Sequence, residues 1–76
     1  MKVLISGYYG FYNIGDEAIL KSIIVALRNE DPNIDIIVLS NDVEYTKSTY
    51  KVNAINRWKL NDIYKELLKC DGLISG

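Results

Sequence analysis

Short, unbroken runs of apolar residues alternate along this chain with stretches in which apolar residues recur every three or four positions. Residues 3–6 and 36–39 form runs of the first kind, and residues 17–30 and 60–69 form stretches of the second kind. An unbroken apolar run is typical of a parallel strand buried on both faces, and helical spacing is typical of a helix that packs on such a sheet. The alternation therefore predicts an α/β fold with a parallel sheet.

The expected elements follow from these patterns and from the turn residues between them. Strands are predicted near residues 2–6, 35–39, 52–55 and 73–75, and helices near 16–30, 43–50 and 60–70. The segment 43–50 is weakly periodic, and both a short helix and an irregular turn are compatible with it. Right-handed crossovers give a sheet of about four strands in the order 3-2-1-4, a half-Rossmann arrangement with helices on both faces.

The composition narrows the classes of function. The chain of 76 residues has room for one small domain, and its nine basic and ten acidic side chains nearly cancel, which argues against nucleic acid and anionic membranes as partners. One cysteine, Cys70, and no histidine leave no internal disulfide and none of the usual zinc ligand sets, so no metal is expected. There is no run of about 20 apolar residues for a membrane helix, and a cytoplasmic location is expected.

The last predicted strand is followed by no helix that could cover it. Ser75 and Gly76 come directly after its apolar residues. We therefore expect residues 1–76 to be the amino-terminal part of a larger first domain. An uncovered parallel sheet also favours a homodimer through its exposed edge or face.

The segment 7–18 follows the first predicted strand, where parallel sheets hold their ligand-facing loops. Its three glycines permit positive φ angles and close approach of a ligand, and its four aromatic residues within five positions are costly to expose unless something covers them. Two common phosphate-binding motifs are excluded. Asp16 and Glu17 stand where a P-loop requires Lys and Ser or Thr, and the glycine spacing differs from the dinucleotide-binding fingerprint.

This loop supplies the candidate site. We assign Asp16 as the candidate catalytic residue, since a carboxylate at the carboxyl edge of the sheet can act as a general base on a hydroxyl. The aromatic side chains could instead pack against the helix or against a missing domain, and Asn13 could bond its own loop backbone. The candidate substrate-binding residues are Gly7, Tyr8, Tyr9, Gly10, Phe11, Asn13, Gly15 and Glu17.

The polar side chains around the loop have structural alternatives as well. Asp16 is the expected N-cap of the first helix, and Glu17 is expected to be a solvated first-turn acid that pairs with Lys21. Arg57 and Trp58 either line a site or cover the edge of the core.

Three segments resemble the amino-terminal part of polysaccharide pyruvyl transferases of the bacterial CsaB type. The Asn-x-Gly-Asp-Glu motif that starts at Asn13 is the more specific element. Tyr12 stands where members of that family usually carry glycine. The three segments are Gly7-Tyr8-Tyr9-Gly10-Phe11 with Asn13-x-Gly15-Asp16-Glu17-Ala18, then Val38-Leu39-Ser40, and finally Asp71-Gly72-Leu73-Ile74-Ser75-Gly76.

The resemblance implies a two-domain enzyme, similar in fold to the GT-B glycosyltransferases, that transfers a pyruvyl group from phosphoenolpyruvate to a cell-wall polysaccharide sugar as a ketal. It implies no cofactor beyond phosphoenolpyruvate as co-substrate, and the acceptor sugar or its lipid-linked precursor as partner. The first domain is expected to lean toward the acceptor, with donor-binding basic and histidine residues elsewhere. The absence of histidine agrees with this, and the isolated segment is expected to be inactive.

Two other functions are compatible with the sequence. A nucleotide or nucleotide-sugar binding module would contact the loop 7–16 and Asn41 or Asp42. A non-catalytic α/β interaction domain would dimerise through the edge of its last strand.

Overall fold

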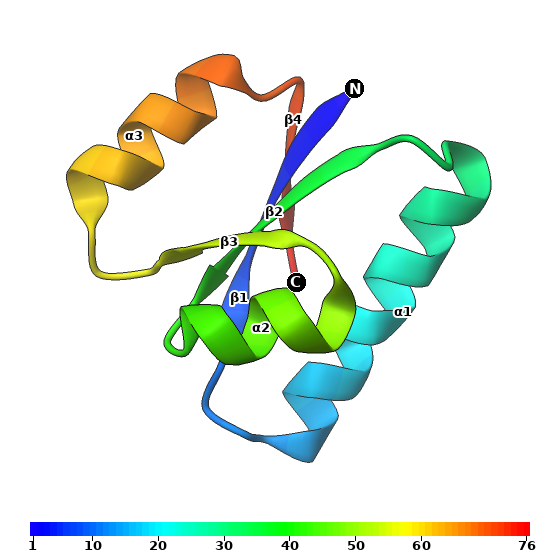
Figure 1. Cartoon of the computed structure of the whole chain (residues 1–76), viewed down its shortest axis with the longest axis vertical. Coiled ribbons are helices and arrows are strands. Elements are labelled where there is room, and N and C mark those ends of the chain that lie inside the picture. The colour runs from blue at the N-terminus through cyan, green and yellow to red at the C-terminus, as the bar shows by residue number, and fades with distance from the viewer.

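The computed structural model describes all 76 residues and has four strands and three helices (Figure 1). The sheet has the order β3-β2-β1-β4, and every pairing is parallel. The α/β class and the order 3-2-1-4 expected from the sequence are therefore confirmed. The strands are β1 (Lys2–Tyr9), β2 (Asp35–Ser40), β3 (Asn53–Asn56) and β4 (Gly72–Ser75), and the helices are α1 (Ile14–Glu30), α2 (Val43–Tyr50) and α3 (Leu60–Lys69).

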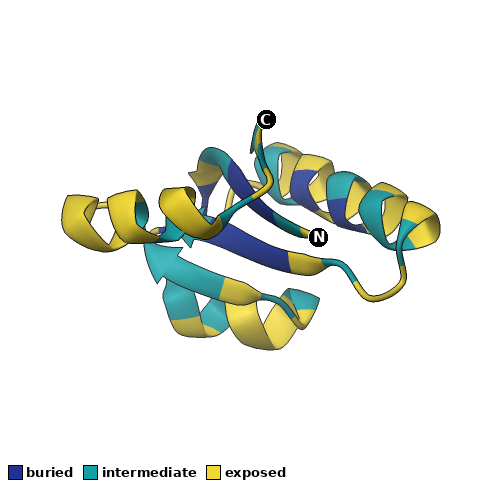
Figure 2. Cartoon of the chain, turned by 90° about the horizontal axis from the view of Figure 1, so that it is seen from above, coloured by how far each residue is buried: buried dark blue, intermediate teal, exposed yellow.

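The helices occupy both faces of the sheet, with α1 and α2 on one face and α3 on the other (Figures 1 and 2). On β1, Val3 and Ile5 belong to the core cluster that α1 completes. Side chains alternate along a strand, so Lys2 and Leu4 point to the opposite face. There Lys2 forms an ion pair with Glu66 of α3.

The core lies between the sheet and α1. Figure 2 shows buried residues on the central strands and on the inner side of α1. In contrast, α3 has no buried residue, and Leu60, Tyr64, Leu68 and the neighbouring Leu73 of β4 are exposed. The α3 face of the sheet is thus only partly covered. The core cluster consists of Val3, Ile5, Tyr9, Leu20, Ile24, Ile36 and Val38.

Two elements differ in extent from the prediction. Strand β1 continues to Tyr9, beyond the expected end near residue 6, with an irregular register between Ile5 and Tyr9. It continues because the Tyr9 side chain enters the core. Helix α1 begins at Ile14, two positions before the expected start near residue 16, because its N-cap is Asn13. The ambiguous segment 43–50 is a helix.

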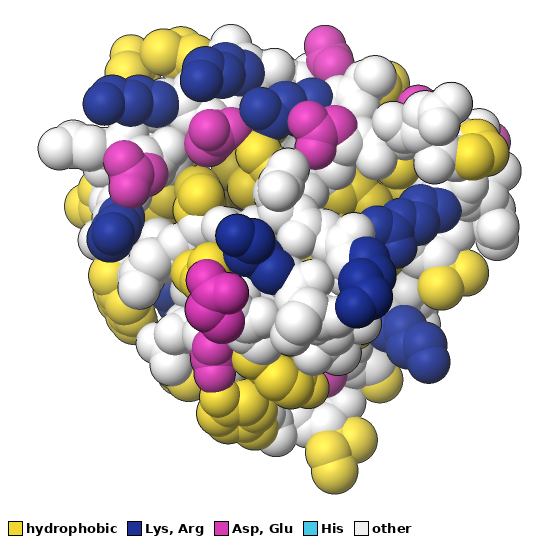
Figure 3. All heavy atoms as spheres, in the orientation of Figure 1, with side chains coloured by type: hydrophobic (Ala, Val, Ile, Leu, Met, Phe, Trp, Pro, Cys, Tyr) yellow, Lys and Arg dark blue, Asp and Glu magenta, His cyan; other side chains and the backbone are white.

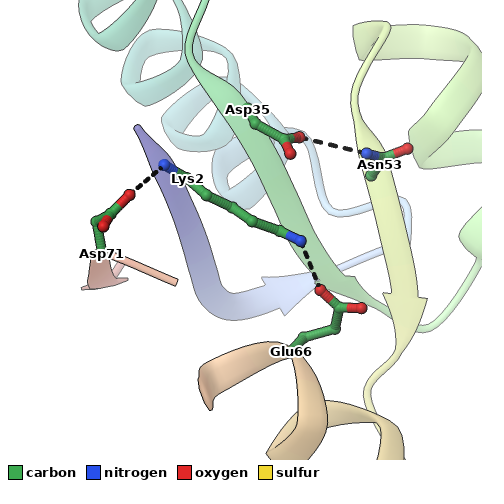
Figure 4. A network of polar contacts seen from close by, with 5 residues as sticks. All are labelled: Lys2, Asp35, Asn53, Glu66 and Asp71. Carbon is green, nitrogen blue, oxygen red and sulfur yellow. Dashed lines mark hydrogen bonds and ion pairs between the residues drawn. The ribbon is translucent and has the colours of Figure 1, made fainter. Parts of the chain in front are cut away.

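A polar network joins the amino ends of the strands (Figure 4). The backbone N–H of Lys2 donates to Asp71 Oδ2 at 2.8 Å, and Lys2 Nζ lies 3.0 Å from Glu66 Oε2, which raises the lysine pKa. Beside it, Asn53 Nδ2 donates to Asp35 Oδ1 at 3.3 Å. These contacts hold β4 and α3 to β1 at one end of the sheet and leave the other end to the loops.

Candidate functional site

The loops that follow the strands meet at the carboxyl edge of the sheet. The backbone N–H of Asn41 donates to the carbonyl of Tyr9 at 3.0 Å, and the N–H of Arg57 donates to the carbonyl of Ser40 at 3.1 Å. Gly76, after β4, is bonded to Ser6 in the same way at 2.8 Å. The segment 7–18 therefore lies where ligands of parallel sheets bind.

The start of α1 corrects one expectation from the sequence. Asn13 is the N-cap, and its Oδ1 accepts a hydrogen bond from the backbone N–H of Asp16 at 3.1 Å. Asp16 is therefore not the N-cap. A helix capped by Asp16 would begin at Glu17, and α1 begins three residues earlier, at Ile14. Its carboxylate forms no hydrogen bond or ion pair with the chain and is half-buried at the carboxyl edge. Asp16 is thus free to interact with a ligand.

Glu17 also differs from the expectation. Its Oε1 accepts a hydrogen bond from the hydroxyl of Tyr50 at 2.6 Å, and its Oε2 accepts one from the backbone N–H of Gly10 at 3.1 Å. It forms no ion pair with Lys21, because both oxygens already have partners within the chain. Burial, reinforced by the bond to Glu17, raises the pKa of Tyr50. Glu17 therefore ties the loop to α2, and its carboxylate is not a solvated surface acid.

Tyr12 is the bulky residue in this loop that has a left-handed backbone, with φ of 63°. A glycine, as the family resemblance implies for this position, would adopt that conformation without steric cost. Here the hydroxyl of Tyr12 donates to the carboxylate of Asp42, and its ring meets the edge of Tyr45 at 5.2 Å between centroids. Asp42 also caps α2 through the N–H of Tyr45, and the bonds from Tyr12 and from that N–H lower its pKa. These contacts compensate the strained backbone.

The aromatic residues of the segment are divided between the core and the surface. Tyr9, one of the candidate substrate-binding residues, is only 1% exposed and belongs to the core cluster, so its side chain packs in the core. Its buried hydroxyl has no hydrogen-bond partner in the chain, and burial and then the charges of Asp16 and Glu17 raise its pKa. Tyr8, on the opposite side of β1, is exposed and stacks on Phe11 with 4.1 Å between ring centroids.

The three loop glycines have different surroundings. A side chain on Gly10, whose φ is +81°, would collide with Ser40 Oγ and with the backbone nitrogens of residues 41 and 42, and one on Gly7 would overlap the ring of Tyr9. These two glycines are thus required by the packing of the chain itself. A Cβ on Gly15 would meet Asn13 Oδ1 at 3.3 Å, a tight contact that a small shift of that side chain would relieve. Gly15 is thus the least crowded of the three glycines.

Arg57 joins the site from the loop after β3, and it was not among the assigned site residues. Its guanidinium carbon lies 4.9 Å from the ring centroid of Tyr8, 5.2 Å from that of Phe11 and 5.3 Å from that of Trp58. Its Nη1 donates to the carbonyl of Gly7 at 3.0 Å. We call Tyr8, Phe11, Arg57 and Trp58 the arginine-aromatic cluster. The sequence signal was an Arg-Trp pair directly after a predicted strand.

A surface hollow of about 450 Å³ begins at Trp58 and is lined further by residues 59–62. No group of three or more His, Cys, Asp or Glu side chains is arranged to hold a metal ion. None of the helices combines the length and apolar character needed to cross a membrane. Acidic and basic side chains are interspersed on the face that Figure 3 shows.

Comparison with known proteins gives one match. The family model of polysaccharide pyruvyl transferase matches residues 13–76. The chain belongs to the polysaccharide pyruvyl transferase family. The resemblance seen in the sequence is thereby confirmed, and the matched region begins at the N-cap Asn13 and contains Gly15, Asp16, Glu17 and Arg57. A search of curated proteins and a search of solved structures each gave no match.

Proposed function

We propose that this chain is the amino-terminal segment of a bacterial, cytoplasmic transferase that moves a pyruvyl group from phosphoenolpyruvate to a cell-wall polysaccharide sugar, or to its lipid-linked precursor, as a ketal. The family match over residues 13–76 carries this proposal. The position of the segment 7–18 at the ligand-binding edge of the sheet supports it.

Ketal formation requires a proton for the methylene carbon of the enolpyruvyl group and a base for the attacking sugar hydroxyls. We assign the base to Asp16, because its half-buried carboxylate has no partner within the chain. Gly15, beside it, is exposed and is the least crowded of the three loop glycines. Gly7, Gly10, Asn13 and Glu17 would act through the shape of the loop, since their contacts lie within the chain.

The base needs a facing acid and a donor site, and these would come from a second domain. The loops at the carboxyl edge form one open wall, on which Tyr8 and Asn13 are exposed. An open wall leaves the reacting groups in water, where electrostatic stabilisation of a transition state is weak. We therefore propose that the 76-residue chain alone is inactive.

A nucleotide-binding module is less well supported. The acid that could bind a ribose after β2 is Asp42, and its oxygens already accept hydrogen bonds from Tyr12 and from the N–H of Tyr45. The Asn41 side chain accepts a hydrogen bond from Trp58 Nε1 at 3.2 Å. Both candidate nucleotide contacts are thus already engaged within the chain.

The decisive experiment measures phosphate release from phosphoenolpyruvate in the presence of a cell-wall glycan acceptor. We expect release by the complete gene product that contains these residues and none by residues 1–76 alone. Asp16→Asn in the complete protein should lower kcat by about 100-fold or more, as expected for loss of a general base. Absence of activity in the complete protein would overturn the transferase assignment, and activity in residues 1–76 would overturn the need for a second domain.

A further inference from the structure

Arg57 is a half-buried cation without an acidic partner. The only ion pair of the chain, between Lys2 and Glu66, lies at the other end of the sheet (Figure 4). The guanidinium has several N–H donors. One hydrogen bond, from Nη1 to the carbonyl of Gly7, engages it within the chain. That bond fixes the group at the carboxyl edge and leaves the remaining donors free. A positioned guanidinium with free donors is suited to carboxylate or phosphate oxygens.

The rings around Arg57 strengthen this preference. Tyr8 and Phe11 stack with an interplanar angle of 11°, and Trp58 is held by its bond to Asn41. Rings close to a guanidinium stabilise its charge and displace water from its faces, so an anion that binds the N–H edge competes with less water. Tyr8 is 57% exposed and Trp58 is 67% exposed, so both retain free ring surface.

The ring surface favours a ligand that carries a sugar. Aromatic rings present large, rigid contact surfaces with two faces, and apolar faces of a pyranose can stack on them. Trp58 also lines the surface hollow formed by residues 58–62, which does not include Arg57 or Tyr8. An anion without a sugar, such as phosphoenolpyruvate, would use the guanidinium and leave the rings unused.

We propose that Arg57, Tyr8 and Trp58 form a subsite for a glycosyl phosphate, in which the guanidinium binds the phosphate and the exposed rings hold the sugar. The assignment of this ligand as the acceptor rests on the proposed function, whereas the binding itself does not. The subsite lies on the α3 side of β1. Tyr9 lies on the opposite, α1 side, where the charge of Asp16 acts on it.

Trp58 is the only tryptophan, so tryptophan fluorescence reports on binding close to this residue. The 76-residue chain is titrated with N-acetylglucosamine 1-phosphate, N-acetylglucosamine, inorganic phosphate and phosphoenolpyruvate, and the emission of Trp58 is followed. We expect saturable binding of the glycosyl phosphate, at least about tenfold tighter than that of the other three probes and weaker at high salt.

Variants separate the two halves of the ligand. Arg57→Lys should weaken binding of the glycosyl phosphate about tenfold or more, because a lysine keeps the charge and loses the fixed fork. Tyr8→Ser should remove the advantage of the glycosyl phosphate over inorganic phosphate. Arg28→Lys is the matched control, since Arg28 bonds the carbonyls of Tyr50 and Lys51, away from the cluster. The affinity of this variant for the glycosyl phosphate should equal that of the wild type.

Amide NMR spectra establish that each variant is folded and locate the bound ligand independently of fluorescence. Equal binding of the glycosyl phosphate by the wild type and a folded Arg57→Lys variant would overturn the proposal, as would no binding at millimolar concentration. Phosphoenolpyruvate binding as tightly as the glycosyl phosphate would overturn the role of the rings and assign the cluster to the donor. Because no turnover is needed, these outcomes are independent of the phosphate-release assay.

Discussion

Asp16 and Glu17 are adjacent acids in the first turn of α1 that have different roles. The Asp16 carboxylate has no partner in the chain, whereas that of Glu17 bonds Tyr50 and the N–H of Gly10. A residue with unused hydrogen-bonding capacity at a ligand-binding edge is available for chemistry. One whose oxygens are already bonded mainly stabilises the fold.

This difference predicts that two matched substitutions change stability by unequal amounts. Glu17→Gln should lower the free energy of unfolding by about 1–2 kcal/mol, because one of its two acceptor oxygens becomes an NH₂ group that faces a donor. Asp16→Asn should change it by no more than about 0.5 kcal/mol. Urea denaturation of both variants and the wild type tests this. Equal losses of stability would show that the two carboxylates have the same structural role.

The loop glycines allow a second matched comparison. Gly10→Ala should cost about 1–3 kcal/mol or more, because the new Cβ meets Ser40 Oγ and the backbone nitrogens of residues 41 and 42, and because φ is +81°. Gly15→Ala should change stability by no more than about 1 kcal/mol, because the helix preference of alanine is offset by a 3.3 Å contact of the new Cβ with Asn13 Oδ1. Thermal unfolding followed by circular dichroism measures both. A stable Gly10→Ala variant would contradict the packing described for this loop.

At the scale of the elements, α1 and α2 are joined by polar contacts as well as by the core. Tyr50 at the end of α2 bonds Glu17, and Arg28 of α1 donates to the carbonyl of Tyr50 at 3.1 Å and to that of Lys51 at 2.6 Å. These bonds satisfy carbonyl groups at the end of α2, where a helix leaves its last acceptors unpaired. The position of α2 therefore depends on side chains that are distant in the sequence.

The Tyr50–Glu17 bond predicts a loss of stability at alkaline pH. The folded chain holds the Tyr50 proton more tightly than the unfolded chain, because the tyrosine pKa is raised from its ordinary value of 10.0. Its contribution is therefore complete below about pH 10 and is lost as the pH rises toward the raised folded-state pKa. Urea denaturation across the alkaline range should show this slope. Tyr50→Phe should reduce the slope, and an unchanged slope would contradict the assignment.

At the scale of the whole molecule, the two faces of the sheet are unequal. The face under α1 and α2 contains the core cluster, whereas the α3 face leaves Leu60, Tyr64, Leu68 and Leu73 exposed. The outer edge of β4 has no neighbouring strand. An exposed apolar face next to an open edge favours association.

We expect residues 1–76 to self-associate as their concentration rises, with the α3 face and the β4 edge in the interface. Sedimentation velocity over a concentration series measures this. Leu68→Lys should shift the distribution toward monomer, because it places a charge in the exposed apolar stripe. Val25→Lys, on the exposed side of α1, is the matched control and should leave the distribution unchanged. A monomer at every concentration would refute the expected homodimer.

Local patterns determined the parts of this protein that depend on neighbours in sequence. The apolar runs 3–6 and 36–39 require burial on both faces, and helical spacing in 17–30 and 60–69 requires a sheet to pack on, so class and strand order were predictable. Three short segments, of which the Asn-x-Gly-Asp-Glu motif is the more specific, indicated the family that the family model confirms.

The tertiary structure alone decided which loop side chains are free. The sequence predicted Asp16 as the N-cap and Glu17 as a solvated acid, because Tyr50, which engages Glu17, lies on another helix. Tyr9 lies in the core and Tyr8 beside Arg57, because β1 continues further than its apolar run suggests. Such roles depend on contacts between residues far apart in the chain. A single sequence records local preferences and contains no direct record of those contacts.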